Sequence, residues 1–116
     1  MKQSESKLQQ SCVKFFRYQY PQWVLFLVAI PNGGRRDAKT GALMKKEGAI
    51  AGAPDLILFD PYGKKLPLLI EMKLPKGVQS ESQVAFQRCY EDAGYTYTIC
   101  RDFATFEKIV ENYLIR

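Results

Sequence analysis

The sequence predicts an α/β sandwich, a single domain in which a mixed sheet of about four strands carries helices on both faces. Apolar runs of strand length and apolar stripes of helical period alternate along the chain and indicate the element order α-β-α-β-β-α-β-α. With 116 residues, of which 47% are hydrophobic and 13% aromatic, the chain can form one packed core but not a second domain. We therefore expect one domain over residues 1–116.

The composition excludes several classes of catalyst. The chain contains no histidine, which excludes triads with a histidine base and zinc sites built on histidine. A formal net charge of +5 makes a polyanion a reasonable partner, although charge alone leaves nucleic acid, an anionic membrane and mere solubility open. The three cysteines, Cys12, Cys89 and Cys100, are widely spaced within apolar patterns, so we expect reduced core residues.

The hydropathy pattern predicts no membrane span. The longest apolar stretch, Trp23 to Ile30, is far shorter than a transmembrane helix, and the polar N-terminus lacks the apolar segment of a signal peptide. We expect a soluble cytoplasmic protein without a membrane partner or an organic cofactor.

Residues 4–19 are predicted to form the first helix, with Ser4 as its N-cap. An apolar stripe at helical spacing runs along it, formed by Leu8, Cys12, Phe15 and Phe16. Glu5 belongs to this stripe, so its side chain is expected to point toward the sheet rather than to solvent. The alternative is that Glu5 only stabilises the helix N-terminus through the helix dipole.

The segment 24–30 is continuous, apolar and rich in β-branched residues, and it predicts a strand buried on both faces. A double glycine and two arginines, Arg35 and Arg36, follow it. An ordinary turn with two solvated arginines is one interpretation of this stretch. A loop that approaches a ligand closely is the other, because glycine permits such an approach.

A short helix is predicted over 38–48 and carries Lys45 and Lys46, which suit phosphate contacts rather than base readout. The loop 48–54 that follows consists of small residues and leads directly to Asp55. Small side chains there leave room for a phosphate beside a metal ion. An ordinary turn is the alternative.

Two apolar runs, within 52–60 and 66–73, flank a Pro/Gly/Lys turn and predict a β-hairpin. If the ladder is centred on Gly63, antiparallel counting sets Asp55 opposite Glu71. Directly opposed residues share a face of the sheet, so the two carboxylates are expected to face each other.

Lys73 projects to the same face as Glu71 because side chains alternate along a strand, and both therefore converge with Asp55. Two carboxylates about 4 Å apart repel by roughly 4 kcal/mol at an effective dielectric of about 20, and one lysine offsets only part of this repulsion. A divalent cation offsets the rest, and oxygen ligands suit Mg²⁺ or Mn²⁺. The pattern predicts metal-assisted phosphodiester hydrolysis. A structural ion pair between Glu71 and Lys73 is the plainer alternative.

The last third of the chain is predicted to form a helix, a strand and a second helix, in that order. Residues 80–93 form a helix in which Ser80 and Gln83 fit a capping box. Residues 95–100 alternate like a strand, and Asp102 caps a closing helix. The apolar face of that closing helix is either core or dimer surface.

Five short motifs occur in an order and spacing that resemble the VRR-NUC (virus-type replication-repair nuclease) family. They are Pro31–Arg36, Leu43–Gly48, Gly52–Leu56, Ile70–Lys73 and Ser80–Gln83. Within them, Pro54 and Asp55 followed by Glu71, Met72 and Lys73 look like the PD-(D/E)xK nuclease signature. The resemblance spans nearly the whole chain and implies a restriction-endonuclease-like fold.

The resemblance also implies a metal-dependent DNA endonuclease. Asp55 and Glu71 would hold Mg²⁺ or Mn²⁺, with the Met72 carbonyl as a further ligand and Glu5 as an outer or second-metal ligand. Lys73 would position or deprotonate the attacking water and stabilise the charge that develops on the phosphate. The lysine need not itself be the base.

Further roles follow from the same resemblance. Gln83 would orient a water or contact the scissile strand, unless it serves only as the helix cap. The residues assigned to the DNA face are Asn32, Arg35, Arg36, Lys45, Lys46 and Lys76. Stand-alone members of the family look like viral or bacterial enzymes of repair and recombination that cleave four-way (Holliday) junctions as homodimers. A non-catalytic, basic DNA-binding accessory module on the same fold is the alternative.

Overall fold

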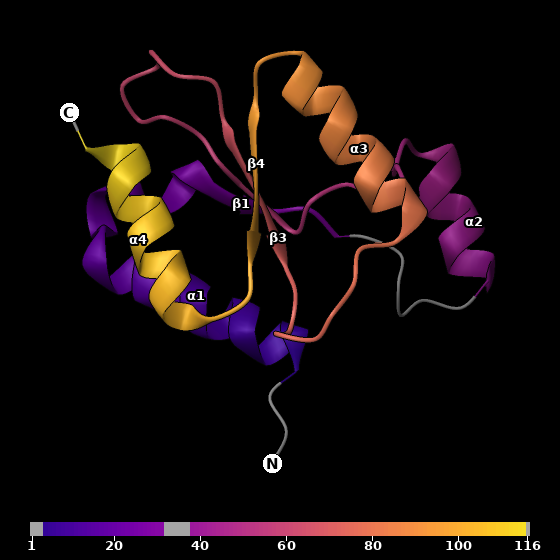
Figure 1. Ribbon diagram of the computed structural model, residues 1–116, viewed down its shortest axis with the longest axis horizontal. Coiled ribbons are helices and arrows are strands. Elements are labelled where there is room, and N and C mark those ends of the chain that lie inside the picture. The colour runs from indigo at the N-terminus through magenta and orange to yellow at the C-terminus, as the bar shows by residue number, and fades with distance from the viewer. Residues whose placement is uncertain (1–3, 32–37, 116) are drawn as a thin grey trace.

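In the computed structural model, which describes residues 4–31 and 38–115, a four-stranded sheet carries helices on both faces (Figure 1). The elements are α1 (Glu5–Gln19), a 3₁₀ helix η1 (Pro21–Phe26), β1 (Leu27–Ala29), α2 (Ala38–Lys46), β2 (Leu56–Leu58), β3 (Leu68–Met72), α3 (Glu81–Asp92), β4 (Thr96–Cys100) and α4 (Phe103–Leu114). The predicted α/β class and mixed sheet are confirmed.

The strands lie side by side in the order β1-β2-β3-β4. The β1–β2 and β2–β3 pairs are antiparallel, whereas β3 and β4 are parallel and α3 forms the crossover between them. In the central hairpin Leu56 pairs with Ile70 and Leu58 with Leu68, so one further step sets Asp55 opposite Glu71. The predicted hairpin register is confirmed.

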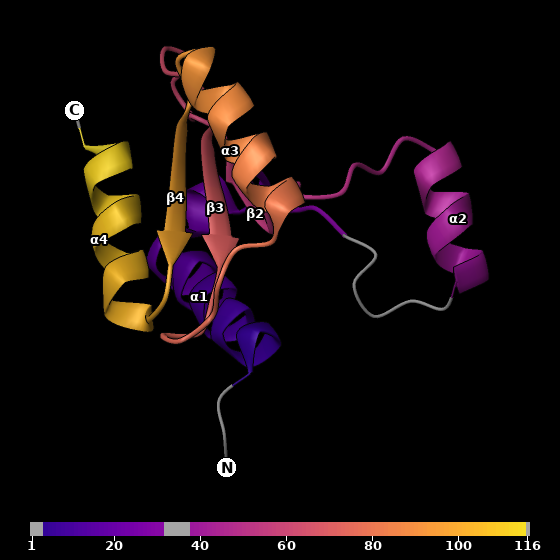
Figure 2. The same ribbon diagram turned by 45° about the vertical axis from the view of Figure 1, so that its right-hand side comes forward.

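The two faces of the sheet differ in what covers them. Leu56, Ile70 and Met72 point into the main hydrophobic core, which α1 and α4 complete with Phe16 and Phe106. The alternate residues of β2 and β3 therefore project to the other face, which α3 covers (Figure 2). Glu71 belongs to this second face.

The predicted strand over 24–30 is wrong in extent and in burial. Its first part lies in η1, where Pro21 occupies the first turn and Trp23 stacks on Tyr20 at 5.9 Å between ring centroids. The strand β1 covers three residues at the edge of the sheet, and Val28 is 42% exposed. An edge strand has one neighbour only, so its apolar side chains are not all covered.

The predicted helix caps are confirmed. The side chains of Ser4, Ser80 and Asp102 each accept a hydrogen bond from a backbone N–H in the first turn of the helix that follows. Cys12 and Cys100 are free and buried, as predicted, whereas Cys89 is exposed on α3 and is not a core residue. Among the described residues, no helix is long and apolar enough to cross a membrane.

Candidate active site

Asp55 stands one residue before β2 and is fixed by three strands. Its carboxylate Oδ2 accepts a hydrogen bond of 2.7 Å from the backbone N–H of Met72 at the end of β3. Its carbonyl oxygen accepts one of 2.9 Å from the N–H of Ile30, just after β1. Asp55 is half-buried. The side chain is therefore held at the end of β3, beside Glu71.

Glu71 is a fully buried carboxylate whose two oxygens have unequal surroundings. Its relative exposure is 0%. Oε1 accepts hydrogen bonds from the hydroxyl of Tyr97 and from the amide of Gln79, the latter at 3.4 Å. Oε2 is buried and has no hydrogen-bond partner within residues 4–31 and 38–115. Leaving a buried acceptor unsatisfied costs about 1–3 kcal/mol and more for a charged group, so Oε2 is the oxygen of Glu71 that is suited to bind a ligand.

Tyr97 lies in β4, two residues before Ile99, which pairs with Glu71 in the parallel ladder. It is 5% exposed. Burial, followed by the hydrogen bond to Glu71, raises the pKa of the Tyr97 hydroxyl above its usual range. The phenol therefore keeps its proton at neutral pH and donates it toward the carboxylate. The sequence prediction did not include Tyr97 or Gln79, and the only signal for Tyr97 was the alternation in 95–100.

Lys73 follows β3 and is half-buried. Its Cδ atom would lie 3.3 Å from a Cβ added to Gly77, so the aliphatic stem of the lysine passes close to the turn after β3. The guanidinium of Arg101 stabilises this turn by donating hydrogen bonds to the carbonyls of Leu74 (2.9 Å) and Gly77 (2.8 Å). Arg101 thus holds the segment against which Lys73 packs.

The structure does not contain the ion pair that was the plainer interpretation of Glu71 and Lys73. Oε1 of Glu71 is bonded to Tyr97 and Gln79, and Oε2 has no hydrogen-bond partner in the described part of the chain. Neither oxygen is hydrogen-bonded to Lys73. A structural pairing of acid and lysine therefore does not explain why a glutamate is buried here.

The predicted orientation of Glu5 is wrong, because its side chain is exposed to solvent. The buried stripe of α1 is formed by Leu8, Cys12 and Phe16, which pack on the face of the sheet opposite to Glu71. The first turn of α1 lies at the end of the sheet where β3 and β4 finish (Figure 2). Within the described residues, no three His, Cys, Asp or Glu side chains gather as a metal site. A role of Glu5 as metal ligand stays a prediction.

Gln83 forms the capping box that the sequence suggested. Its side-chain oxygen accepts a hydrogen bond of 2.8 Å from the N–H of Ser80, and its own N–H donates to the Ser80 hydroxyl at 3.2 Å. The oxygen is thereby used within the helix cap. Contact of Gln83 with a substrate stays a prediction.

Among the small residues before Asp55, Gly52 allows the loop to pack closely against α3. A Cβ on Gly52 would lie 2.2 Å from the carbonyl oxygen of Ser82, so the absence of a side chain there lets the loop pass close to the first turn of α3. Room for a phosphate beside Asp55 stays a prediction. Gly48 has no atom within 4 Å of such a Cβ. The loop 48–54 is therefore held against α3 through Gly52.

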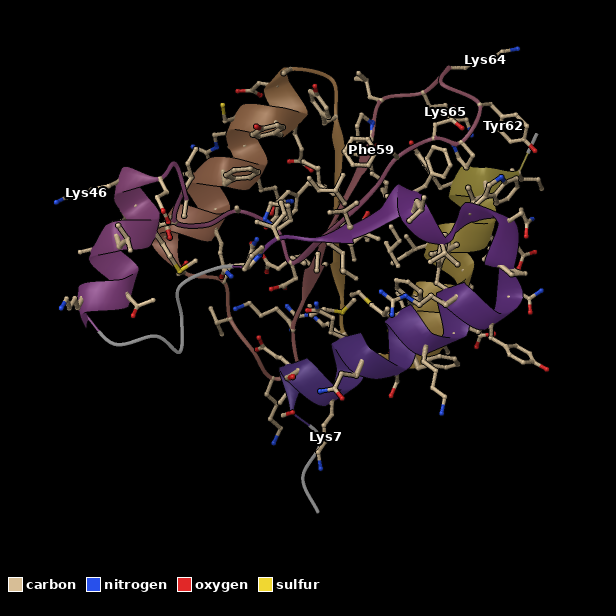
Figure 3. All side chains as sticks on the ribbon, turned by 180° about the vertical axis from the view of Figure 1, so that it is seen from behind. Lys7, Lys46, Phe59, Tyr62, Lys64 and Lys65 are labelled. Atoms are coloured by element: carbon tan, nitrogen blue, oxygen red, sulfur yellow. The ribbon has the colours of Figure 1, made fainter. Side chains whose placement is uncertain are left out.

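The predicted DNA-contacting residues fall into two groups. Asn32, Arg35 and Arg36 lie outside the described residues. Lys45, Lys46 and Lys76 are exposed. The first two belong to α2, which stands apart from the sheet on the side that α3 covers (Figures 1 and 2), and Lys46 projects away from the protein (Figure 3).

Comparison with known proteins identifies the family. Residues 3–103 match the VRR-NUC domain. The chain belongs to the VRR-NUC family. It therefore contains a nuclease-type domain. A solved structure of a "VRR_NUC domain protein" superposes on 97% of this chain and 89% of its own with a TM-score of 0.80, at 19% identity, which confirms the shared fold. No curated protein matches this chain.

The acid pair of this VRR-NUC domain fits a hard divalent cation. Oε2 of Glu71 is a buried oxygen without a donor, and Asp55 is tethered beside it. The N–H of Met72 donates to Asp55, so Met72 lies beside the acid pair, and its carbonyl as a further ligand stays a prediction. Two carboxylates match Mg²⁺, which usually binds through one or two carboxylates and retains several waters.

Proposed function

We propose that this VRR-NUC domain is a Mg²⁺- or Mn²⁺-dependent endonuclease that cleaves branched DNA, four-way junctions in particular, as a homodimer. The observation that carries the proposal is the pairing of Asp55 with a buried Glu71 whose Oε2 has no hydrogen-bond partner among the described residues. A buried carboxylate oxygen without a donor, next to a second carboxylate, is suited to bind a cation.

The residues of the site would have distinct roles. Asp55, Glu71 and the carbonyl of Met72 would bind the cation, which when bound supplies Lewis-acid polarisation of the phosphate and lowers the pKa of a coordinated water. Lys73 would hold the attacking water or stabilise the extra negative charge on the phosphate, since it follows Glu71 by two residues and an ammonium group is suited to an anion. The turn held by Arg101 would keep Lys73 in place.

A preference for DNA shape rather than sequence is supported by the basic residues of the predicted DNA face that belong to the described part of the chain. Lys45, Lys46 and Lys76 are exposed lysines, which contact phosphates as point charges. Phosphate contacts set the position of a duplex but do not read its bases. A four-way junction requires two cuts related by symmetry, and a homodimer would supply two active sites in that relation.

The experiment that tests this function compares cleavage of labelled four-way junction, flap and linear duplex DNA in Mg²⁺, Mn²⁺ and EDTA. The variants are Glu71→Gln, which keeps the shape of the buried side chain, and Lys73→Met, which keeps an aliphatic stem. Lys64→Ala is the matched control, because it removes a lysine from the exposed loop before β3 at the other end of the sheet (Figure 3). Light scattering of the same samples measures the oligomeric state.

We expect cleavage in either metal and none in EDTA. Glu71→Gln should abolish cleavage, Lys73→Met should slow it by about 100-fold or more, and Lys64→Ala should retain the wild-type rate. Cleavage that survives both site substitutions would contradict the site. Junction binding without cleavage by the wild type would instead support the accessory DNA-binding module.

A further inference from the structure

The two carboxylate oxygens of Glu71 differ in their hydrogen bonds, and this difference fixes the orientation of the carboxylate. Both donors that reach it, the Tyr97 hydroxyl and the Gln79 amide, bond to the same oxygen, Oε1. The other oxygen, Oε2, is equally buried and has no donor among residues 4–31 and 38–115. Two donors on one oxygen fix the rotation of the carboxylate and leave Oε2 as the oxygen that is available to a ligand.

A chain of side-chain amides determines which way Gln79 faces. Glu91 accepts a hydrogen bond of 3.2 Å from the amide nitrogen of Gln87. The oxygen of Gln87 is thereby turned to Gln79 and accepts a hydrogen bond of 2.9 Å from its amide nitrogen. That same nitrogen lies 3.4 Å from Oε1 of Glu71. Because a carboxylate only accepts, Glu91 sets the direction of both amides and makes Gln79 a donor toward Glu71.

Tyr97 is held in position by packing as well as by its hydroxyl. It is 5% exposed, and its ring lies 6.3 Å from the ring of Phe86 on α3. Its backbone is fixed by the parallel ladder, in which Tyr97 pairs with Leu69 of β3. The hydroxyl therefore reaches Glu71 from a rigid strand rather than from a loop.

We propose that Tyr97 and Gln79 are positioning residues that occupy Oε1 of Glu71 and thereby present Oε2 to the divalent cation. The inference rests on the proposed function, since it concerns the same cation site. Residues that orient a ligand by hydrogen bonds typically change metal affinity by about 10- to 100-fold when they are replaced. Both residues donate to Oε1 of Glu71, so in this proposal they act on the cation through Glu71.

The test measures binding of Mn²⁺ alone to the full chain, without DNA, by electron paramagnetic resonance of the free ion. Tyr97→Phe removes the hydroxyl and keeps the ring that packs on Phe86. Gln79→Leu removes the donor from the other residue and provides a second, independent variant. Tyr95→Phe is the matched control, because its ring packs on Tyr90 of α3 and its hydroxyl is not bonded to Glu71. Thermal unfolding without metal shows that each variant is folded.

We expect the Kd for Mn²⁺ to rise about 10- to 100-fold in Tyr97→Phe and in Gln79→Leu, and to stay at the wild-type value in Tyr95→Phe. A wild-type Kd in folded Tyr97→Phe and Gln79→Leu would overturn the inference, whatever their thermal stability, and would leave the metal site itself standing. Failure of the wild type to bind Mn²⁺ would overturn the cation site of the proposed function together with the inference.

Discussion

Replacement of Gly52 by alanine tests whether the contact between the loop 48–54 and α3 positions the acid pair. Gly52 has φ +89°, and an added Cβ would lie 2.2 Å from the carbonyl oxygen of Ser82 and 2.9 Å from the nitrogen of Gln83. Ordinary contact begins at 3.4 Å, so the loop and the helix must separate by about 1.2 Å, the difference between 3.4 Å and 2.2 Å. All three close atoms belong to the backbone of α3, which cannot rotate away as a side chain can.

Gly48→Ala is the matched control for Gly52→Ala. Gly48 has φ +104°, and no atom lies within 4 Å of its added Cβ. Both substitutions place alanine in a left-handed conformation, which costs about 1–2 kcal/mol. Only Gly52→Ala adds overpacking, which costs about 1–3 kcal/mol. The free energy of unfolding should therefore fall by about 1–2 kcal/mol in Gly48→Ala and by about 2–5 kcal/mol in Gly52→Ala.

Urea denaturation followed by the fluorescence of the single tryptophan, Trp23, measures both free energies. Gly52 precedes Asp55 by three residues, so a displaced loop should also weaken the hydrogen bond that the Met72 N–H donates to the Asp55 carboxylate. We expect weaker Mn²⁺ binding in folded Gly52→Ala and unchanged binding in Gly48→Ala. Equal destabilisation of the two variants, together with equal Mn²⁺ binding, would refute the positioning role of the contact.

Three further predictions concern the core, the turn after β3 and a helix cap. Phe106→Ala should lower the free energy of unfolding by about 3–5 kcal/mol, because Phe106 is 0% exposed in the main core; an unchanged urea midpoint would contradict this. Arg101→Met should speed amide exchange in the turn that Arg101 holds and slow cleavage by up to about 100-fold through Lys73, without changing the Kd for Mn²⁺. Asp102→Ala should lower the thermal midpoint at pH 7, because the hydrogen bond from the N–H of Thr105 holds the pKa of Asp102 below its ordinary 3.8. A lowered pKa stabilises the fold above the ordinary pKa and loses this effect as the pH falls through the lowered pKa, so wild type and variant should converge in acid; a constant gap would contradict the assignment.

Local patterns were enough to predict most of the fold. The N-caps Ser4, Ser80 and Asp102 were readable because a cap needs one polar side chain at the first turn of a helix. The hairpin register was readable because the turn around Gly63 joins strands adjacent in sequence, so that counting from the turn sets the pairing. The same counting brought Asp55 opposite Glu71.

The errors concern residues whose environment depends on distant parts of the chain. The run 24–30 has the composition of a central strand, but β1 is short and lies at the edge of the sheet. Cys89 fits an apolar pattern, yet it lies on an exposed part of α3. Glu5 extends the apolar stripe of α1, but that stripe faces the core on the opposite side of the sheet from Glu71. Periodicity predicts that a face is apolar and does not predict what covers it.

The sequence by itself determined the element order, the helix caps and the facing of two carboxylates across a hairpin, because each follows from the pattern within one element or from counting across one turn. Only the tertiary structure decided how Glu71 is held. Tyr97 reaches it because β4 returns parallel to β3 through the crossover helix α3, and Gln79 reaches it from the segment that enters α3. These hydrogen bonds join separate elements and arise from packing of the whole domain, which periodicity along the chain does not encode.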